Sequence, residues 1–154
     1  MKGKNMESNY LISIVGKQKI DGETDTVEVV TEGSYVFRNG KYFITYEEYD
    51  KENPSEHYTS VVKAEGEKMV TIMRAGGISS RLTLEKDRRH YCHYSVPVGE
   101  MMIGIYTSQI NSTLSEEGGE LFVKYTIDFN ASLASENEFH ITVKHKNDSA
   151  ELVL

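Results

Sequence analysis

The sequence contains a single cysteine, Cys92, no tryptophan and only two prolines among its 154 residues. One cysteine cannot form an intramolecular disulfide, and chains without disulfides are typical of reducing compartments. No apolar run approaches the roughly 20 residues that a membrane-spanning helix needs. The first residues, Met1–Ser8, lack the apolar core of a signal peptide. These absences lead us to expect a cytoplasmic protein without a membrane partner.

Positive charge is also scarce. Asp and Glu outnumber Lys and Arg by 24 to 17, which gives a formal net charge of -7. The densest basic group, residues 86–90, is interrupted by Asp87. Binding to nucleic acid needs basic patches that displace counterions from phosphates. We therefore expect no nucleic-acid partner.

The dominant pattern in the sequence is alternation with a period of two residues, which is typical of half-buried strands. In residues 26–38 the odd positions form the more apolar face and carry Val27, Val29, Thr31, Gly33, Tyr35 and Phe37. The following Asn39-Gly40 pair is a strong hairpin signal, because both residues tolerate positive φ angles. Similar runs, separated by turn residues, predict strands at 9–18, 26–38, 41–50, 57–65, 68–74, 78–85, 88–96, 101–113, 120–133 and 138–146.

These strands predict an all-β protein, because no segment has a convincing helical stripe of apolar residues. Short connections imply antiparallel neighbours, and closing such a sheet removes its exposed edges. We therefore favour a single antiparallel up-and-down meander β-barrel over a sandwich. The chain length suits one domain. We expect residues 1–8 to be disordered and residues 9–154 to form the barrel.

An ordered series of short motifs runs along nearly the whole chain. In sequence order they are Gly33-Ser-Tyr35, Tyr42-Phe-Ile-Thr-Tyr46-Glu-Glu48, Met73-Arg74-Ala-Gly76, Tyr94-Ser-Val-Pro97-Val-Gly99, Thr107 and Tyr125. In this order the chain resembles the YwiB-like family, small bacterial proteins of unknown function with a calycin-type (lipocalin-like) β-barrel. The resemblance implies the barrel and a bacterial cytoplasm, and it implies no established activity. The missing tryptophan departs from the Gly-x-Trp of true lipocalins.

The glycine-rich segment Ala75-Gly76-Gly77 could be a phosphate-binding loop or a hairpin. A Walker-type loop needs a lysine and a following helix. Here no such lysine is present, and the residues that follow alternate as a strand. We predict a hairpin in which the glycines supply positive φ angles.

The arginine before this hairpin, Arg74, is a candidate ligand-binding residue. It shares its predicted face with Val70 and Ile72, so it points into the barrel if that face is the inner one. A buried charge needs a partner, and Glu48 is predicted on the inner face of its own strand. Arg74 and Glu48 could form a structural ion pair that plugs one end of the barrel. Alternatively, Arg74 could face the carboxylate or phosphate of a ligand.

The tyrosines form the second candidate group. The inferred inner faces carry four of them, Tyr35, Tyr42, Tyr46 and Tyr125. Buried hydroxyl groups need hydrogen-bond partners. The four could pack in the core with their hydroxyls at the barrel mouth, or they could line a polar cavity in a network with Glu48, Arg74 and Thr107.

Catalytic and metal-binding patterns are weak. His90 and Cys92 share a strand face and could bind a metal, but no Cys-x-x-Cys or His-Glu-x-x-His motif completes the ligand set. No Gly-x-Ser-x-Gly elbow is present. The neighbouring acids Glu47 and Glu48 lie on opposite strand faces, which does not suit glycoside chemistry. We therefore expect no catalytic residue, no metal and no cofactor.

The favoured function is non-catalytic binding of a small anionic or amphipathic ligand inside the barrel. The candidate binding residues are Arg74, Glu48, Tyr35, Tyr42, Tyr46, Tyr125 and Thr107. The alternative is a filled barrel that acts as a scaffold through protein contacts or as a homodimer. A weaker alternative is an enzyme that acts on a small organic anion at the barrel mouth.

Overall fold

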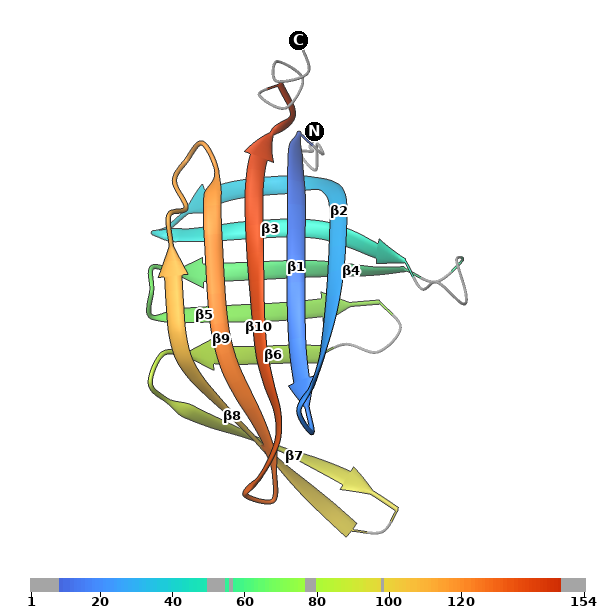
Figure 1. Ribbon diagram of the computed structural model, residues 1–154. Coiled ribbons are helices and arrows are strands. Elements are labelled where there is room, and N and C mark those ends of the chain that lie inside the picture. The colour runs from blue at the N-terminus through green and yellow to red at the C-terminus, as the bar shows by residue number, and fades with distance from the viewer. Residues whose placement is uncertain (1–8, 50–54, 56, 77–79, 98, 148–154) are drawn as a thin grey trace.

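A computed structural model describes residues 9–49, 55, 57–76, 80–97 and 99–147 of the chain (Figure 1). The predicted disorder of residues 1–8 lies outside this range and stays a prediction, as do the positions of Gly77 and Ile78. The strands are β1 (Tyr10–Ile20), β2 (Glu23–Arg38), β3 (Lys41–Tyr49), β4 (His57–Glu65), β5 (Met69–Ala75), β6 (Ser80–Glu85), β7 (Arg89–Val96), β8 (Gly99–Ser112), β9 (Gly119–Phe129) and β10 (Ser132–His145).

The strands form one antiparallel meander that is nearly closed into a barrel. The sheet has 10 strands in the order β6-β5-β4-β3-β2-β1-β10-β9-β8-β7, so the first and last strands of the chain pair with each other. The opening lies between β6 and β7, where the isolated parallel bridge Lys86–Thr107 connects the two sides. The predicted all-β meander barrel is confirmed.

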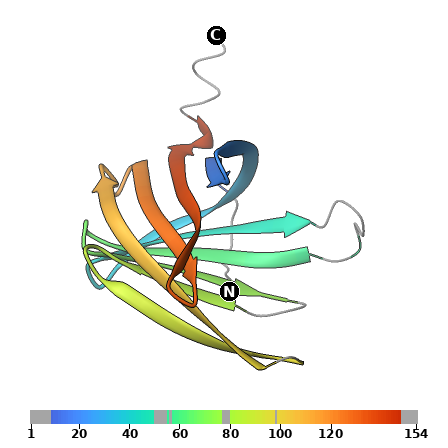
Figure 2. The same cartoon turned by 60° about the horizontal axis from the view of Figure 1, so that its bottom comes forward.

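The barrel is flattened into two layers whose strands cross (Figures 1 and 2). The layer of β3, β4, β5 and β6 lies behind the layer of β1, β8, β9 and β10 in Figure 1, and β2 bends to join them. Glu23–Gly33 pairs with β1 and Gly33–Arg38 pairs with β3, so Gly33 is at the corner. A Cβ at Gly33 would lie 2.3 Å from the Thr45 carbonyl oxygen and 2.4 Å from Ile12 Cδ1.

The space between the layers holds the hydrophobic core. In the middle of most strands, the alternating residues that face inward are buried, as the period-two pattern predicts. The side chains with almost no exposed surface include Ile12, Ile44, Val62, Val70, Leu84, Ile110, Leu121, Val123, Ile141 and Val143. They come from both layers, so the two faces pack against each other to close the centre of the barrel.

The ends of the inner faces are more open than the sequence pattern predicts. Val27 is 60% exposed, Phe37 44% and Phe129 43%, although the alternation places all three on inner faces. β1, β9 and β10 extend beyond the layer behind them in Figure 1. An inward side chain at such a strand end has no facing layer to cover it, so apolar surface remains at the mouths of the barrel.

The hairpin turns follow the predicted chemistry with one correction. Asn39 and Gly40 have φ angles of 54° and 77°, and Gly76 has a φ angle of 105° in the β5–β6 connection, which confirms that hairpin. The predicted break between strands 120–133 and 138–146 is wrong. The turn is at Asn130-Ala131, with φ angles of 48° and 72°, and residues 134–137 belong to β10.

Within the described ranges, we find no helix long and apolar enough to cross a membrane.

Candidate functional site

The predicted partners Arg74 and Glu48 meet at one end of the rear layer. Arg74 Nη2 donates to Glu48 Oε2 at 2.9 Å, and Ser60 Oγ donates to the same oxygen at 2.6 Å. The guanidinium also lies over the Tyr58 ring, 5.8 Å from its centroid. The side chains are 46% and 29% exposed, so the pair lies at an open mouth. The expected contact between Arg74 and Glu48 is therefore confirmed, while a role in ligand binding stays a prediction.

Tyr46 lies beside this ion pair and is buried. Its burial is the main cause of a pKa raised to about 12, and the negative charge of Glu48 raises it further. The nearby Arg74 charge and a hydrogen bond with Ser60 act in the opposite direction. The phenol is therefore neutral at physiological pH and is part of the polar cluster at this end.

Tyr35 and Tyr42 lie at the opposite end of the rear layer. Their rings stack with centroids 5.8 Å apart, and Tyr10 packs edge-on against Tyr35 at 5.4 Å. The Tyr35 hydroxyl donates to the Ser115 carbonyl oxygen at 2.7 Å, and burial raises the pKa of this phenol. Along β3, Tyr42 is roughly 20 Å from Glu48 at the usual rise per residue. The pair of Tyr35 and Tyr42 and the Arg74–Glu48 pair therefore cannot both contact one small ligand.

Tyr125 and Thr107 belong to the front layer and pair with each other across β9 and β8. Burial raises the pKa of Tyr125. Thr107 is completely buried, and its Oγ1 atom has no hydrogen-bond partner among the described residues. The seven predicted candidates thus occupy three places in the barrel rather than one.

The row that contains Tyr125 and Thr107 continues across the front layer. Tyr125 pairs with Asn137 on β10, and Asn137 pairs with Gln18 on β1. We call these four side chains, Gln18, Asn137, Tyr125 and Thr107, the interior polar row; Gln18, at its end, is exposed to solvent. The amide of Gln18 donates to Asn137 Oδ1 at 3.1 Å, and Asn137 Nδ2 donates to Ser135 Oγ at 2.8 Å. Asn137 is 7% and Ser135 5% exposed, so these polar groups lie inside the protein.

A cavity of about 450 Å³ opens directly beside the interior polar row, between the tips of the β1–β2 and β9–β10 hairpins. We call it the mouth cavity. Its apolar lining comes from Ile20, Ile127, Phe129, Leu133 and Ala134, and its polar lining from Gln18, Asp21, Ser132 and Ser135. The cavity therefore has apolar walls and a base of hydrogen-bonding side chains, which suits a small amphipathic molecule.

The comparison with known proteins agrees with this fold. A family model described as a domain of unknown function, DUF1934, matches residues 12–141. The chain belongs to the DUF1934 family. The resemblance to YwiB-like proteins is thereby confirmed, because the "uncharacterized beta-barrel protein YwiB" of Bacillus subtilis (strain 168) is 25% identical over 126 residues. The match covers 82% of this chain and 84% of that protein.

The crystal structure of the ywiB protein from Bacillus subtilis has the same fold as this DUF1934 domain. The TM-score is 0.70 with 23% sequence identity, over 88% of this chain and 90% of that one. At this level of identity the likeness concerns the fold. The chemistry of the mouth cavity must therefore be argued from the side chains of this chain.

In this DUF1934 domain, Gln18, Ser135 and Asn137 were not among the residues predicted from the sequence to form a site. The misplaced turn put Ser135 and Asn137 in a loop, where polar residues need no explanation. Continuing the alternation of Phe139, Ile141 and Val143 backwards past Asn137 would have placed both on the inner face of β10.

No metal-binding cluster of three or more His, Cys, Asp or Glu side chains occurs within the described part of the domain. His90, considered above as a metal ligand, instead lies with Nε2 at 2.9 Å from Glu85 Oε1.

Proposed function

We propose that the protein binds a small amphipathic molecule in the mouth cavity, without catalysis. The apolar part of the ligand would pack against Ile20, Ile127 and Phe129. Its polar group would reach the buried Ser135 and the exposed Gln18, which both line the cavity. The observation that carries this proposal is the chain of hydrogen bonds that runs beside an apolar cavity, from the exposed Gln18 through the buried Asn137 to the buried Ser135.

The base of the cavity can donate hydrogen bonds to a ligand. A hydroxyl group has one proton to donate, and Ser135 Oγ already accepts from Asn137, so its own proton remains available. Thr107, farther along the interior polar row, is buried without a partner for its hydroxyl group. An unpaired buried hydroxyl costs about 1–3 kcal/mol, and a bound polar group or an ordered water would remove that cost.

The charges favour a neutral ligand over an anionic one. The residues that line the mouth cavity include Asp21 and no lysine or arginine among those described. At the other mouth, Glu48 offsets the positive charge of Arg74. A carboxylate in the mouth cavity would lose its hydration without gaining a cationic partner. The sequence also suggested an anionic ligand. Such a ligand would have to bind at the Arg74 end of the barrel and displace Glu48 from Arg74.

The test uses N-phenylnaphthylamine, a neutral amphipathic fluorophore, and anilinonaphthalene sulfonate, its anionic relative, in fluorescence titrations of the full chain. We expect the neutral probe to bind more tightly. Phe129→Ser should weaken its binding about tenfold, because a phenyl contact is removed. Phe37→Ser is the matched control, since Phe37 and Phe129 have nearly equal exposure, 44% and 43%, at different places in the barrel.

A second pair of variants separates the two mouths. Ser135→Ala should weaken the neutral probe, whereas Ser60→Ala, which alters the Arg74–Glu48 cluster, should not. If Ser60→Ala lost binding and Ser135→Ala retained it, the binding site would be at the Arg74 end instead. Absence of binding by either probe would favour the filled-barrel scaffold that acts through protein contacts.

A further inference from the structure

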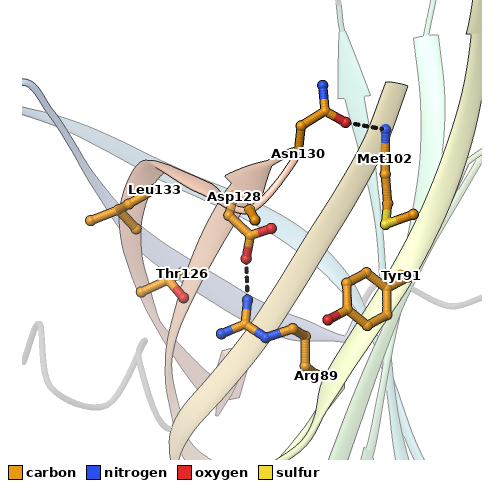
Figure 3. A pocket seen from close by; sticks show the side chains of 8 residues that line it. Arg89, Tyr91, Met102, Thr126, Asp128, Asn130 and Leu133 are labelled. Atoms are coloured by element: carbon orange, nitrogen blue, oxygen red, sulfur yellow. Dashed lines mark hydrogen bonds and ion pairs between the residues drawn. The ribbon is translucent and has the colours of Figure 1, made fainter. Parts of the chain in front are cut away.

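A second cavity, of about 540 Å³, lies on the outward face of β7, β8 and β9, below the β9–β10 turn (Figure 3). We call it the outer cleft. Its lining includes Arg89, Tyr91, Met102, Thr126, Asp128 and Leu133. Arg89, Tyr91, Met102 and Asp128 belong to the strand face opposite Ile103 and Ile105, which point toward the core. The outer cleft and the mouth cavity share only Leu133 among their described lining residues.

An ion pair between Arg89 and Asp128 forms one side of the outer cleft. The two residues lie on β7 and β9, so the arginine must reach across β8. Arg89 pairs with Tyr106 of β8, so it reaches Asp128 diagonally, and the β8 residue that pairs with Asp128 is Gly104. A Cβ at Gly104 would lie 2.5 Å from Asp128 Oδ1. The missing side chain thus makes the space that the ion pair occupies.

The ion pair is partly buried and lies beside an aromatic ring. The Arg89 guanidinium lies over the Tyr106 ring, 5.4 Å from its centroid. The Asp128 side chain is 11% exposed and that of Arg89 is 39% exposed. Figure 3 shows one carboxylate oxygen of Asp128 directed at Arg89 and the other turned toward the side of Tyr91 and Met102. Because a guanidinium has five N–H donors, the arginine retains donors for a ligand.

Apolar side chains stand exposed around this pair. Tyr91 is 58% exposed, Met102 39% and Leu133 65%. Farther along the same outward face the exposed positions are charged, with Lys17 and Lys124 on either side of Glu138. A group of exposed apolar side chains beside a partly buried ion pair is typical of a binding site and not of an ordinary solvated sheet face.

The chemistry of the pair limits the ligand. A lone anion that approached Arg89 would be repelled by Asp128, and a lone cation would be repelled by Arg89. A molecule that carries a negative and a positive group side by side satisfies both partners, and charge-assisted hydrogen bonds are the strongest of their kind. We propose that the outer cleft binds a zwitterionic amino acid with an apolar side chain. Its carboxylate would face Arg89, its ammonium group Asp128, and its side chain Tyr91, Met102 and Leu133.

Titration calorimetry of the full chain with L-phenylalanine tests this assignment. N-acetyl-L-phenylalanine lacks the ammonium charge and L-phenylalanine amide lacks the carboxylate. Each should bind about tenfold more weakly or worse, because one charged hydrogen bond is lost. Equal binding of the three compounds, or no binding of L-phenylalanine, would overturn the proposal.

Variants locate the site. Asp128→Asn keeps the shape of the side chain and should remove the preference for L-phenylalanine over its acetylated form. Tyr91→Ser should weaken L-phenylalanine binding, whereas Tyr49→Ser, at a tyrosine of similar exposure (66% against 58%), should not. Unchanged binding in both Asp128→Asn and Tyr91→Ser would overturn the assignment to this cleft.

This inference is independent of the proposed function, and the two can fail separately. Phe129→Ser lies outside the outer cleft and should leave L-phenylalanine binding unchanged while weakening N-phenylnaphthylamine. L-Phenylalanine at saturation should not displace that probe. Displacement would mean that both compounds share one site and would overturn the assignment of the amino acid to the outer cleft.

Discussion

At the scale of single residues, the ion pair of Arg74 and Glu48 stabilises the barrel only slightly. Both side chains retain contact with solvent, 46% and 29% exposed, and solvent-exposed pairs contribute about 0.2–1 kcal/mol. We expect Arg74→Met to lower the free energy of unfolding by about 1 kcal/mol or less in urea titrations. Arg81→Met, at an exposed position on the neighbouring strand, is the control. A loss of several kcal/mol in Arg74→Met would mean that the pair is a buried structural plug.

The raised pKa of Tyr46 makes stability depend on pH at the alkaline end. The phenol has a pKa of 10.0 when solvated and about 12 in the folded protein. Between these values the unfolded chain has released a proton that the folded protein retains, so rising pH favours unfolding. The contribution is complete below pH 10.0 and is lost as pH rises toward 12.

We expect Tyr46→Phe to reduce this alkaline loss of stability, measured as urea midpoints in a pH series. Some loss should remain, because burial also raises the pKa values of Tyr35 and Tyr125. Tyr49→Phe, at an exposed position, should leave the pH dependence unchanged. An identical slope in Tyr46→Phe and the parent protein would contradict the assignment to Tyr46.

At the scale of the elements, the corner of β2 depends on a glycine. Gly33→Ala would place a methyl group 2.3 Å from a backbone oxygen, which cannot move without disturbing the pairing of β2 with β3. We expect a loss of about 3 kcal/mol in the free energy of unfolding, at the upper end of the usual effect of overpacking. Gly16→Ala on β1 has no atom within 4 Å of the added methyl group and should change stability little. Equal losses in the two variants would exclude steric crowding as the cause.

The strands themselves were largely predictable, and the exceptions have physical reasons. Alternation identified the strands because most of them have a buried or half-buried face opposite a solvated one. The turn at Asn130-Ala131 was missed because alanine rarely adopts a positive φ angle, which costs about 1–2 kcal/mol. The burial of Asp128 was also missed. This burial depends on Gly104 of the neighbouring β8 and on Arg89 of β7, one strand farther. The alternation within β9 alone gives no information about either residue.

At the scale of the whole molecule, the partners within a site were harder to predict than the faces of the strands. Arg74 and Glu48 could be matched because both lie on inner faces of neighbouring hairpins. The interior polar row joins β1 to β10, the two ends of the chain, and alternation does not give the register between such distant strands. The closure of β1 on β10 therefore determines which polar side chains meet inside the barrel.

The seam between β6 and β7 is the weakest part of this closed structure. Across it, Asp87 N donates to the Thr107 carbonyl oxygen at 2.7 Å, Thr107 N donates to Arg88 O at 3.4 Å, and His90 Nε2 lies 2.9 Å from Glu85 Oε1. The other neighbouring strands pair along ladders of many residues. Local opening needs less free energy where fewer contacts must break.

In native-state hydrogen exchange, we expect the Asp87 and Thr107 amides to exchange through local opening, with a free energy of opening a few kcal/mol lower than that of global unfolding. The Val123 amide, in the middle of β9 with strands on both sides, should open only with the whole barrel. Exchange of Thr107 at the global rate would show instead that the seam is as stable as the rest of the barrel.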